Sequence, residues 1–424
     1  MSTEHNVAII GAGLSGLTLA LALHQQGIKS TIYESRPAPL NIGGAVMLSP
    51  NALRVLDALD VYSVVKPQGY SFERLDFRDS DGNVTEMYEF GDVSKYGYQG
   101  LRIYRHVLID TLVAALKKIS VDVVYGRKYS HVVSEDEAAN TSGGVTFAFA
   151  DGTTETASLL VGADGIHSTV RRHLYPDLET KFLGMAGITA AVPTAQLKLP
   201  ADGSYHIPVT IASKNKERGG AFVIAPQNPD GGEVLIGKQR RIQEHERAAW
   251  EQRGSLADGR AAAVAFLQED ADNYPDIVAN AVATIDPAKI NVWPFYVVPK
   301  LDRWASATRR VILLGDAAHA IPPSAGQGIN QAFEDVYMLA LLLGRQWNTT
   351  DVADPQAALD FWQSYRQARI DNVFALNHQI DLRRMPATDA AFVTGDARQP
   401  FDLTWLYKPD FKKDVEDWVA QQKE

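Results

Sequence analysis

The stretch Val7-Ala8-Ile9-Ile10-Gly11-Ala12-Gly13-Leu14-Ser15-Gly16 decides the fold, because an apolar run meets three spaced glycines there. The four consecutive apolar residues predict a short, buried parallel strand. Leu and Ala recur at helical spacing from Leu14 to Gln26, and Gly27 is the residue type that ends a helix. Residues 30–34 predict a second parallel strand. The whole forms a βαβ unit of the usual size, about 30 residues.

Each glycine has a physical role in such a unit. Gly11 permits the sharp turn from strand to helix, Gly13 lets a pyrophosphate approach the backbone, and Gly16 lets the helix pack close to the strand. The pyrophosphate would rest on the positive end of the helix. Glu34 ends the second strand, near the position where such units carry an acid that binds the ribose of the dinucleotide. Its carboxylate would repel a 2′-phosphate, which disfavours NADP. The motif therefore predicts a site for NAD or FAD.

A second glycine motif separates these two cofactors. Residues 311–314 form another apolar run, which ends in Gly315-Asp316-Ala317-Ala318-His319. A carboxylate at the end of a strand can accept hydrogen bonds from polyol hydroxyls, and FAD has a ribityl chain whereas NAD has none. Gly326-Gln327-Gly328-Ile329-Asn330 then opens a predicted helix from Gln331, whose N-terminus would stabilise negative charge on a reduced flavin. We therefore predict FAD.

These motifs resemble those of the single-component (group A) FAD-dependent aromatic monooxygenases, the family that includes para-hydroxybenzoate hydroxylase. Three stretches match in the family's order: the glycines of residues 11–16, Asp164-Gly165-Ile166-His167-Ser168-Thr169-Val170-Arg171, and Gly315–His319 with the prolines after it. The resemblance implies a set of cofactor-binding residues: Gly11, Gly13, Leu14, Ser15, Gly16, Glu34, Arg36, Gly44, Ala45, Arg105, Asp164, Arg171, Gly315, Asp316, Gly326, Gly328 and Ile329.

The resemblance also assigns individual roles. It implies that Glu34 holds the adenosine ribose, that the loop Gly43-Gly44-Ala45 passes beside the flavin, and that Asp316 holds ribityl oxygens. Asp164 and Arg171 match a motif linked both to the FAD pyrophosphate and to use of the nicotinamide cofactor.

Three residues of these motifs have structural alternatives. Arg105 opens a predicted helix from Tyr104 and matches a family arginine near the cofactor, but an exposed helix position with a packed stem would also suit it. Arg171 would also suit a structural ion pair. We interpret His319 as a buried, hydrogen-bonded structural residue, because the sequence shows no partner base or metal ligand for it.

The remaining chain predicts an α/β protein with a Rossmann-type FAD-binding domain, an antiparallel-sheet substrate domain and C-terminal helices. Residues 71–90 alternate apolar and polar side chains as a hairpin does, residues 185–240 contain several strand-like runs, and residues 243–280 have a helical pattern. We expect a discontinuous FAD domain of residues 1–70, 100–180 and 290–365. Residues 71–99 and 181–289 would form the substrate domain, and residues 366–424 a C-terminal helical segment. We interpret the stretch after about residue 380 as packing on the protein or as a contact with a partner.

Composition excludes several classes of protein. The net charge of −10 and the sequence pI of about 5.5 argue against nucleic acid as a partner. The chain has no cysteine, which excludes disulfides and a Cys nucleophile, and its scattered histidines predict no metal site. No apolar run approaches the roughly 18 residues of a membrane span, and no signal peptide is visible. We predict a cytoplasmic protein without membrane contact, and the oligomeric state stays open.

The resemblance implies a reaction. NAD(P)H would bind transiently and reduce FAD, and O2 would form a flavin C4a-hydroperoxide that hydroxylates a small aromatic, phenolic or polycyclic substrate. Only one dinucleotide fingerprint and no Cys pair are present, unlike glutathione-reductase-type enzymes, and no two tryptophans have the spacing of the halogenase motif. An FAD-dependent reductase or oxidase and a non-enzymatic flavin-binding module remain alternatives.

No side chain is assigned a catalytic role by the motifs, since the cofactor supplies the chemistry. Tyr205, His206 and Tyr296 are weak candidates for orienting or deprotonating a phenol. The alternative for such aromatic residues is ordinary core packing.

Overall fold

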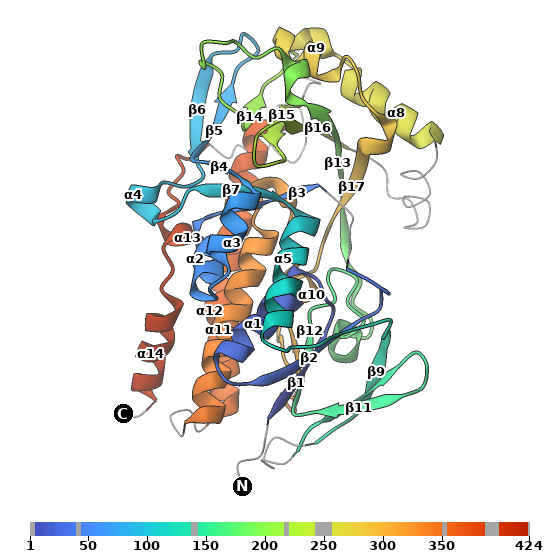
Figure 1. Ribbon diagram of the computed structural model, residues 1–424, viewed down its shortest axis with the longest axis vertical. Helices are drawn as coiled ribbons and strands as arrows, with labels where there is room; N and C mark the ends of the chain where they lie inside the picture. Colours follow the sequence, from blue (N-terminus) through green and yellow to red (C-terminus); the bar gives the residue numbers. More distant parts are fainter. Residues whose placement is uncertain are drawn as a thin grey trace.

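The computed structural model describes residues 5–39, 44–136, 143–215, 220–241, 257–349, 354–385 and 398–422 (Figure 1). A parallel sheet with its helices lies at one end of the molecule, near both termini, and a large, mainly antiparallel sheet lies at the other end. Long helices at the C-terminal end of the chain run beside the parallel sheet. The predicted α/β fold class, with its Rossmann-type part, its antiparallel sheet and its C-terminal helices, is confirmed.

The parallel sheet consists of five strands: β1 (Asn6–Ile10), β2 (Lys29–Glu34), β8 (Val123–Tyr125), β12 (Leu159–Gly162) and β18 (Val311–Leu313). Their order is β18-β12-β1-β2-β8, and every neighbouring pair is parallel. The three predicted motifs follow β1, β12 and β18, which are adjacent. Because parallel strands end on the same side, all three turns emerge at one edge of the sheet, where α/β proteins bind ligands.

Helices cover one side of this sheet: α1 (Leu14–Gln25), α5 (Arg105–Lys118) and α11 (Gly328–Asn348). Helix α1 packs against both α5 and α11 (Figure 1). A three-stranded antiparallel sheet lies on the other side: β9 (Tyr129–Glu135), β10 (Val145–Phe149) and β11 (Thr154–Ala157). Tyr33 of β2 packs against Phe147 and Phe149 of β10, so aromatic contacts join the two sheets.

The large sheet consists of seven strands: β5 (Arg74–Arg78), β6 (Val84–Glu89), β13 (Lys181–Pro193), β14 (Val209–Ile211), β15 (Phe222–Pro226), β16 (Glu233–Arg241) and β17 (Ile290–Val297). Their order is β17-β13-β16-β15-β14-β5-β6, and only the β14–β5 pair is parallel. The predicted hairpin of residues 71–90 is β5 and β6.

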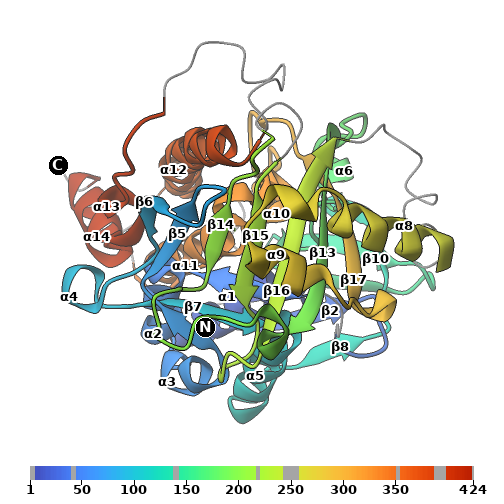
Figure 2. The ribbon, with the colours of Figure 1, turned by 90° about the horizontal axis from the view of Figure 1, so that it is seen from above.

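Two helices, α8 (Ala257–Gln268) and α9 (Asp276–Val282), cover one face of the large sheet, as Figure 2 shows from above. Ile188, Ile224 and Ile236 are buried beneath them in a core of their own. We call this the outer face. Side chains of a strand alternate between faces, so the residues in between form an inner face directed toward the rest of the molecule.

A small antiparallel sheet lies between the two main parts: β3 (Ala45–Leu48), β7 (Gly100–Tyr104) and β4 (Tyr70–Phe72). Leu101 and Ile103 of β7 are buried in the main core. Arg102 and Tyr104 alternate with them and reach the large sheet, where Arg102 donates to the Gln227 side chain and Tyr104 donates to Glu233. The small sheet thus joins the two parts.

The C-terminal part consists of α12 (Pro355–Arg384), α13 (Thr404–Tyr407) and α14 (Phe411–Gln421). Phe411, Val415 and Trp418 recur at helical spacing and are buried, so α14 packs on the protein itself, against α11. Shorter helices complete the described chain: α2 (Pro50–Ala58), α3 (Tyr62–Val65), α4 (Val93–Tyr96), α6 (Arg171–Leu174) and α10 (Asp316–His319).

Two features bear on the predicted domain boundaries, which stay a prediction. Helix α12 continues across residue 366, and β17 belongs to the large sheet although it falls in the range 290–365. The predicted helical stretch of residues 243–280 contains α8 and α9, while its part before residue 257 lies outside the described residues.

Candidate functional site

The first glycine turn requires glycine at two of its three positions. Gly11 has φ +108°, and a Cβ on it would lie 2.6 Å from the carbonyl oxygen of Ala163. A Cβ on Gly16 would lie 2.0 Å from the carbonyl oxygen of Gly11. A Cβ on Gly13, by contrast, would meet nothing within 4 Å. The first turn of α1 has no side-chain cap and no acidic residue, so its N–H groups are available to an anion beside Gly13.

Glu34 ends β2 with its carboxylate buried beside this turn. One carboxylate oxygen accepts the N–H of Ala12 at 2.9 Å, and the other accepts the N–H of Arg36 at 2.8 Å. The Arg36 guanidinium lies 3.5 Å from the same carboxylate and is largely exposed. The structure thus brings Glu34 and Arg36 to the glycine turn, and Glu34 also fixes the backbone of that turn.

Asp164 lies directly against Gly11, because a Cβ on Gly11 would come within 3.1 Å of the Asp164 Cα. Its Oδ2 accepts the N–H groups of Thr169 at 2.7 Å and Val170 at 3.2 Å. Its Oδ1 is buried and has no hydrogen-bond partner among the described residues. Burial raises the pKa of this carboxyl. Asp164 therefore presents an unsatisfied acceptor beside the first turn.

Arg171 is buried and makes no ion pair in the part of the chain that the structure describes. Its Nη1 donates to the carbonyl oxygen of Ala317 at 2.9 Å, and its Nη2 donates to that of Ile166 at 2.6 Å. Burial lowers its pKa. The guanidinium therefore links the turn after β12 to the turn after β18.

The turn after β18 packs on the start of α1. Gly315 has φ +56°, and a Cβ on it would lie 3.0 Å from the Ser15 Oγ and 3.1 Å from the Ala332 Cβ. Glycine is required there both for the left-handed backbone and for the close approach. The first and third motifs are consequently in contact, although 300 residues separate Ser15 from Gly315 in the sequence.

Asp316 follows this turn with an exposed side chain. Its Oδ1 lies 3.9 Å from where a Cβ on Gly328 would be, so it faces the start of α11. The surrounding protein raises the pKa of its carboxyl even though solvent reaches it, while the charges of His319 and Arg105 act the other way. Arg105 begins α5, and its backbone N–H donates to the carbonyl oxygen of Gly44 at 3.3 Å. Gly44, Arg105, Asp316 and Gly328 are therefore brought together.

The loop before α11 is held against β3 by Asn330, whose Nδ2 donates to the carbonyl oxygens of Met47 and Gly326 at 3.0 and 2.7 Å. Gly326 has φ +64°, and a Cβ on it would lie 3.4 Å from the Met47 Cβ. Helix α11 begins at Gly328, and Ile329 in its first turn is half-buried. The loop that was predicted to pass beside the flavin enters β3 at Ala45, while Gly43 lies outside the described residues.

A buried charge network behind the third turn was not predicted from the sequence. His319 is buried and its Nε2 lies 2.5 Å from the Asp335 Oδ2, which also accepts the N–H of Gly315 at 3.0 Å. Arg366 of α12 donates to Asp335 at 2.8 Å and to Glu334. His319 is buried and hydrogen-bonded, as predicted, and its partner is Asp335, which the sequence did not reveal. The sequence feature that could have revealed this network is the pair of adjacent acids, Glu334 and Asp335, within the apolar helical pattern of residues 331–343.

This network keeps its acids charged. Burial alone would raise the pKa of Glu334, but Arg369 and Arg366 lower it below its usual value. Burial would also raise the pKa of Asp335, but His319 and Arg366 lower that pKa below its usual value. The turn that carries Asp316 is therefore fixed by charge-assisted hydrogen bonds from α11 and α12.

The inner face of the large sheet is the surface next to these turns. A Cβ on Gly44 would lie 3.7 Å from Gln227 and 3.9 Å from Leu235, both inner-face residues. Thr189, Val223 and Leu235 are uncharged and only half-buried, whereas the outer-face residues between them are fully buried. The side-chain oxygens of Thr210 and Gln239 are buried on the inner face without hydrogen-bond partners in the described chain.

The structure does not bring the three weak catalytic candidates together. Tyr205 packs against the outer-face core, and the Arg78 guanidinium lies 4.0 Å from the centre of its ring. His206 is exposed beside it. Tyr296 lies on β17, four strands from β14, which is about 19 Å at the usual strand spacing. Tyr296 contacts the rings of Phe182 and His167, so it is the one near a predicted motif.

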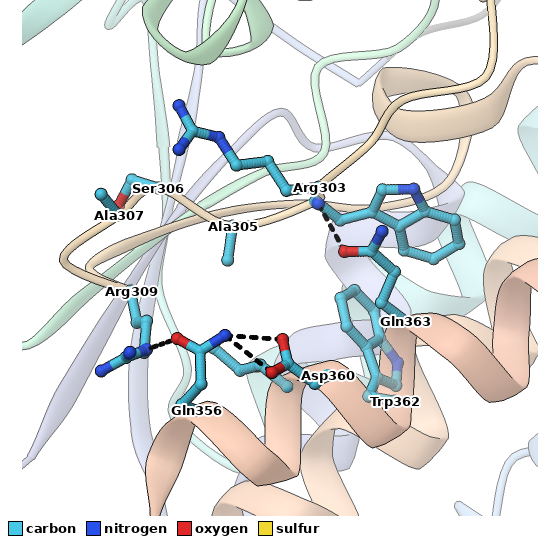
Figure 3. Close-up of a pocket in the computed structure, with 11 residues that line it drawn as sticks. Arg303, Ala305, Ser306, Ala307, Arg309, Gln356, Asp360, Trp362 and Gln363 are labelled. Carbon is cyan, nitrogen blue, oxygen red and sulfur yellow. Dashed lines mark hydrogen bonds between the residues drawn. The ribbon is translucent and has the colours of Figure 1, made fainter.

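A separate pocket of about 170 Å³ lies between the loop before β18 and the start of α12 (Figure 3). Gln356 accepts from Arg309 and donates to the Asp360 carboxylate at 2.6 Å, and the backbone N–H of Trp304 donates to the Gln363 side chain at 2.7 Å. Most polar groups of the pocket thus bond to one another, whereas the indole N–H of Trp304 is buried without a hydrogen-bond partner in the described chain. The pocket lies alongside β18, because Trp304 bonds to Leu313 and Ser306 to Val311, and none of its lining residues belongs to the three turns. We therefore assign it no role in cofactor binding.

Comparison with known proteins identifies the family. The family described as FAD binding domain matches residues 4–375. This chain belongs to that FAD-binding family. A 3-amino-4-hydroxybenzoate 2-monooxygenase of Streptomyces platensis, PtmB3, is 29% identical to it, with 95% of each chain covered. A 6-hydroxynicotinate 3-monooxygenase of Bordetella bronchiseptica is 27% identical, with 89% of this chain and 92% of the relative covered.

The fold of this FAD-binding family also recurs in a solved structure. HpxO of Klebsiella pneumoniae, complexed with FAD and uric acid, matches with a TM-score of 0.74 and 21% identity, covering 99% of this chain and 97% of that one. The family predicted from the three motifs is therefore confirmed. Within the described residues, no helix is long and apolar enough to cross a membrane.

The site geometry fits FAD on observations of this chain. The space beside Gly13 is open at an uncapped helix N-terminus, which suits a pyrophosphate. The Asp164 Oδ1 is a buried acceptor without a partner, and the Asp316 carboxylate is exposed next to the first turn of α11.

Proposed function

We propose that this chain is an FAD-dependent monooxygenase that uses NAD(P)H and O2 to hydroxylate a small aromatic or phenolic substrate. The observation that carries the proposal is the convergence of three turns, after β1, β12 and β18, next to the half-buried, uncharged inner-face residues Thr189, Val223 and Leu235. The relatives named as monooxygenases of an aminohydroxybenzoate and a hydroxynicotinate cover nearly the whole chain and support it.

The cofactor would be held by residues of the three turns. The first-turn N–H groups of α1, from Leu14 to Gly16, would bind the pyrophosphate, and Glu34 with Arg36 would flank the adenosine ribose. Asp164 would accept a hydrogen bond through its free Oδ1, and Asp316 would accept from ribityl hydroxyls. Arg171 would act as a positioning residue, since both ends of its guanidinium are bound to backbone.

FAD, when bound, supplies hydride acceptance from NAD(P)H and transfer of one oxygen atom from O2. The proposed balance is ArH + NAD(P)H + O2 + H⁺ → ArOH + NAD(P)⁺ + H2O. The chain itself would hold the ring on the inner face, where Thr189, Val223 and Leu235 offer uncharged contacts, and would exclude water from it. Thr210 and Gln239 offer free hydrogen-bonding atoms on the same face. No described side chain needs to act as a nucleophile.

The test of this proposal is the mass of the product. Purified protein should consume NAD(P)H and O2 in the presence of a suitable phenol or hydroxylated aromatic acid, and the product should contain one additional oxygen. Saturation or dehydrogenation of the substrate without oxygen gain would support the reductase or oxidase alternative instead. Bound FAD that NAD(P)H never reduces, with any of a broad substrate panel, would favour a non-enzymatic role.

Asp316→Ala is expected to weaken FAD binding roughly 10- to 100-fold, because hydrogen bonds to a carboxylate contribute about 1.5–3 kcal/mol. The measurement is the FAD content of the purified variant, followed by titration of the apoprotein with FAD. Asp302→Ala is the control, since Asp302 is an exposed acid in the loop before β18. Equal FAD affinity in the two variants contradicts the role assigned to Asp316.

A further inference from the structure

Among the described residues, Arg102 is a buried cation whose side chain contacts neither a carboxylate nor a backbone carbonyl. Six arginine and lysine side chains are buried in the described ranges: Arg78, Arg102, Arg171, Lys238, Arg366 and Arg383. Three of them pair with carboxylates, and two more donate to backbone carbonyls. The Arg102 side chain makes a single hydrogen bond within the described chain, from Nη2 to the neutral side-chain oxygen of Gln227 at 3.1 Å.

This arrangement leaves a strong donor group unused. Arg102 is 7% exposed, and its Nε has no hydrogen-bond partner among the described residues. A guanidinium carries five N–H donors, so four of them remain available. Burial lowers the pKa of Arg102 to about 10, which leaves it charged at neutral pH. A buried charge without a partner destabilises the fold, so its presence points to an anion that arrives from outside the chain.

The position of Arg102 connects it to the inner face. Its neighbours across the small sheet are Met47 of β3 and Tyr70 of β4, and these three residues share the face directed at the large sheet. The Gln227 oxygen that Arg102 contacts also accepts the N–H of Ala45 at 3.1 Å. Arg102 therefore lies where the predicted flavin loop meets the half-buried, uncharged inner face.

We propose that Arg102 binds the carboxylate of an aromatic acid substrate. The planar guanidinium matches a carboxylate with two parallel hydrogen bonds, while the uncharged inner face accepts the ring. Gln227 directly follows β15 of the large sheet, so its bond to Arg102 directs the guanidinium toward that sheet. The inference rests on the proposed function, because it names the class of substrate for that site.

The test compares acids with their amides in a binding assay that needs no turnover. FAD-loaded wild type, Arg102→Gln, Arg102→Lys and Arg102→Met would be titrated with 4-hydroxybenzoate, 6-hydroxynicotinate and 3-amino-4-hydroxybenzoate, and with the matching amides. The flavin absorbance difference spectrum reports binding. We expect the wild type to bind at least one acid about tenfold or more tighter than its amide. Arg102→Gln should weaken that acid about 100-fold and the amide less than about threefold, and Arg102→Lys should restore part of the difference.

Two further readouts separate this role from the alternatives. Arg102→Met should leave the thermal unfolding midpoint of the FAD-free protein unchanged or raised, because an unpaired buried charge is removed. A lowered unfolding midpoint, together with equal losses of binding affinity for acid and amide, would show that Arg102 only supports the packing of the small sheet. This result would overturn the proposal. A shifted flavin midpoint potential with unchanged acid binding would assign Arg102 to the flavin instead, and would overturn it too.

The outcomes also distinguish this inference from the proposed function. Wild type that binds no acid, or binds acid and amide equally, overturns the role of Arg102 even if a neutral phenol is hydroxylated. Tight, Arg102-dependent binding of an acid that is never oxygenated supports the role of Arg102 and contradicts the monooxygenase proposal.

Discussion

Gly13→Val is expected to abolish FAD retention while leaving the protein folded. A Cβ on Gly13 meets nothing within 4 Å, and its φ of −76° is accessible to any residue, so the fold has room for the side chain. The isopropyl group would occupy the space beside the N-terminus of α1 where the pyrophosphate is proposed to lie. Overpacking of this kind weakens binding roughly 10- to 100-fold or more. The measurement is the FAD content of the purified variant and the affinity of its apoprotein for FAD.

Gly16→Ala is the matched control for this prediction. Its Cβ would lie 2.0 Å from the carbonyl oxygen of Gly11 and 3.2 Å from the Ile9 side chain. Helix propensity alone would favour alanine by about 1 kcal/mol, but the contact with Gly11 outweighs it. This variant should lower the thermal unfolding midpoint of the apoprotein, whereas Gly13→Val should change the free energy of unfolding by no more than about 1 kcal/mol. A Gly13→Val protein that remains yellow contradicts the proposed position of the cofactor.

Arg366→Met is expected to produce the largest loss of stability. Arg366 is fully buried and pairs with both Glu334 and Asp335, so its removal takes a shared counter-charge from two buried carboxylates. Removal of one partner of a buried ion pair lowers the free energy of unfolding by about 3–5 kcal/mol. For a chain of this size, that corresponds to a decrease of roughly 3–6 °C in the unfolding midpoint, measured on the apoprotein. FAD retention should also fall, because Asp335 holds the backbone of Gly315.

Arg345→Met is the control for that variant, because Arg345 lies on α11 but pairs with Glu416 at the surface. Exposed pairs contribute about 0–1 kcal/mol, so the unfolding midpoint should barely change. Similar decreases for the two variants would contradict the structural role assigned to the buried network.

The parts of the site that are local in sequence could be predicted from it. Each of the three motifs consists of a short apolar strand and a turn that contains glycine, or glycine and aspartate. The requirement for these residue types comes from neighbours only a few positions away in the sequence. The structure contains these three strands and turns, and its strand order adds that all three turns meet at one sheet edge. It also bears out the interpretation of His319 as a structural residue.

The remaining parts depend on contacts between distant segments. Arg102 meets Gln227 125 positions away, and Arg366 meets Glu334 through the packing of two helices. No local pattern gives the partner in either case. The aromatic candidates show the same limit: Tyr205 lies in the segment before β14, and only its packing against the outer-face core places it away from Tyr296.

The measurement that tests the central claim most directly is oxygen transfer from isotopically heavy O2. The FAD-loaded protein would be incubated with NAD(P)H, heavy O2 and the aromatic acid that binds most tightly in the Arg102 titrations, and the product mass would be determined. We expect one heavy oxygen atom in the product for each NAD(P)H consumed in productive turnover. A product without heavy oxygen, or with oxygen derived from water, would contradict the assignment of this chain as a monooxygenase.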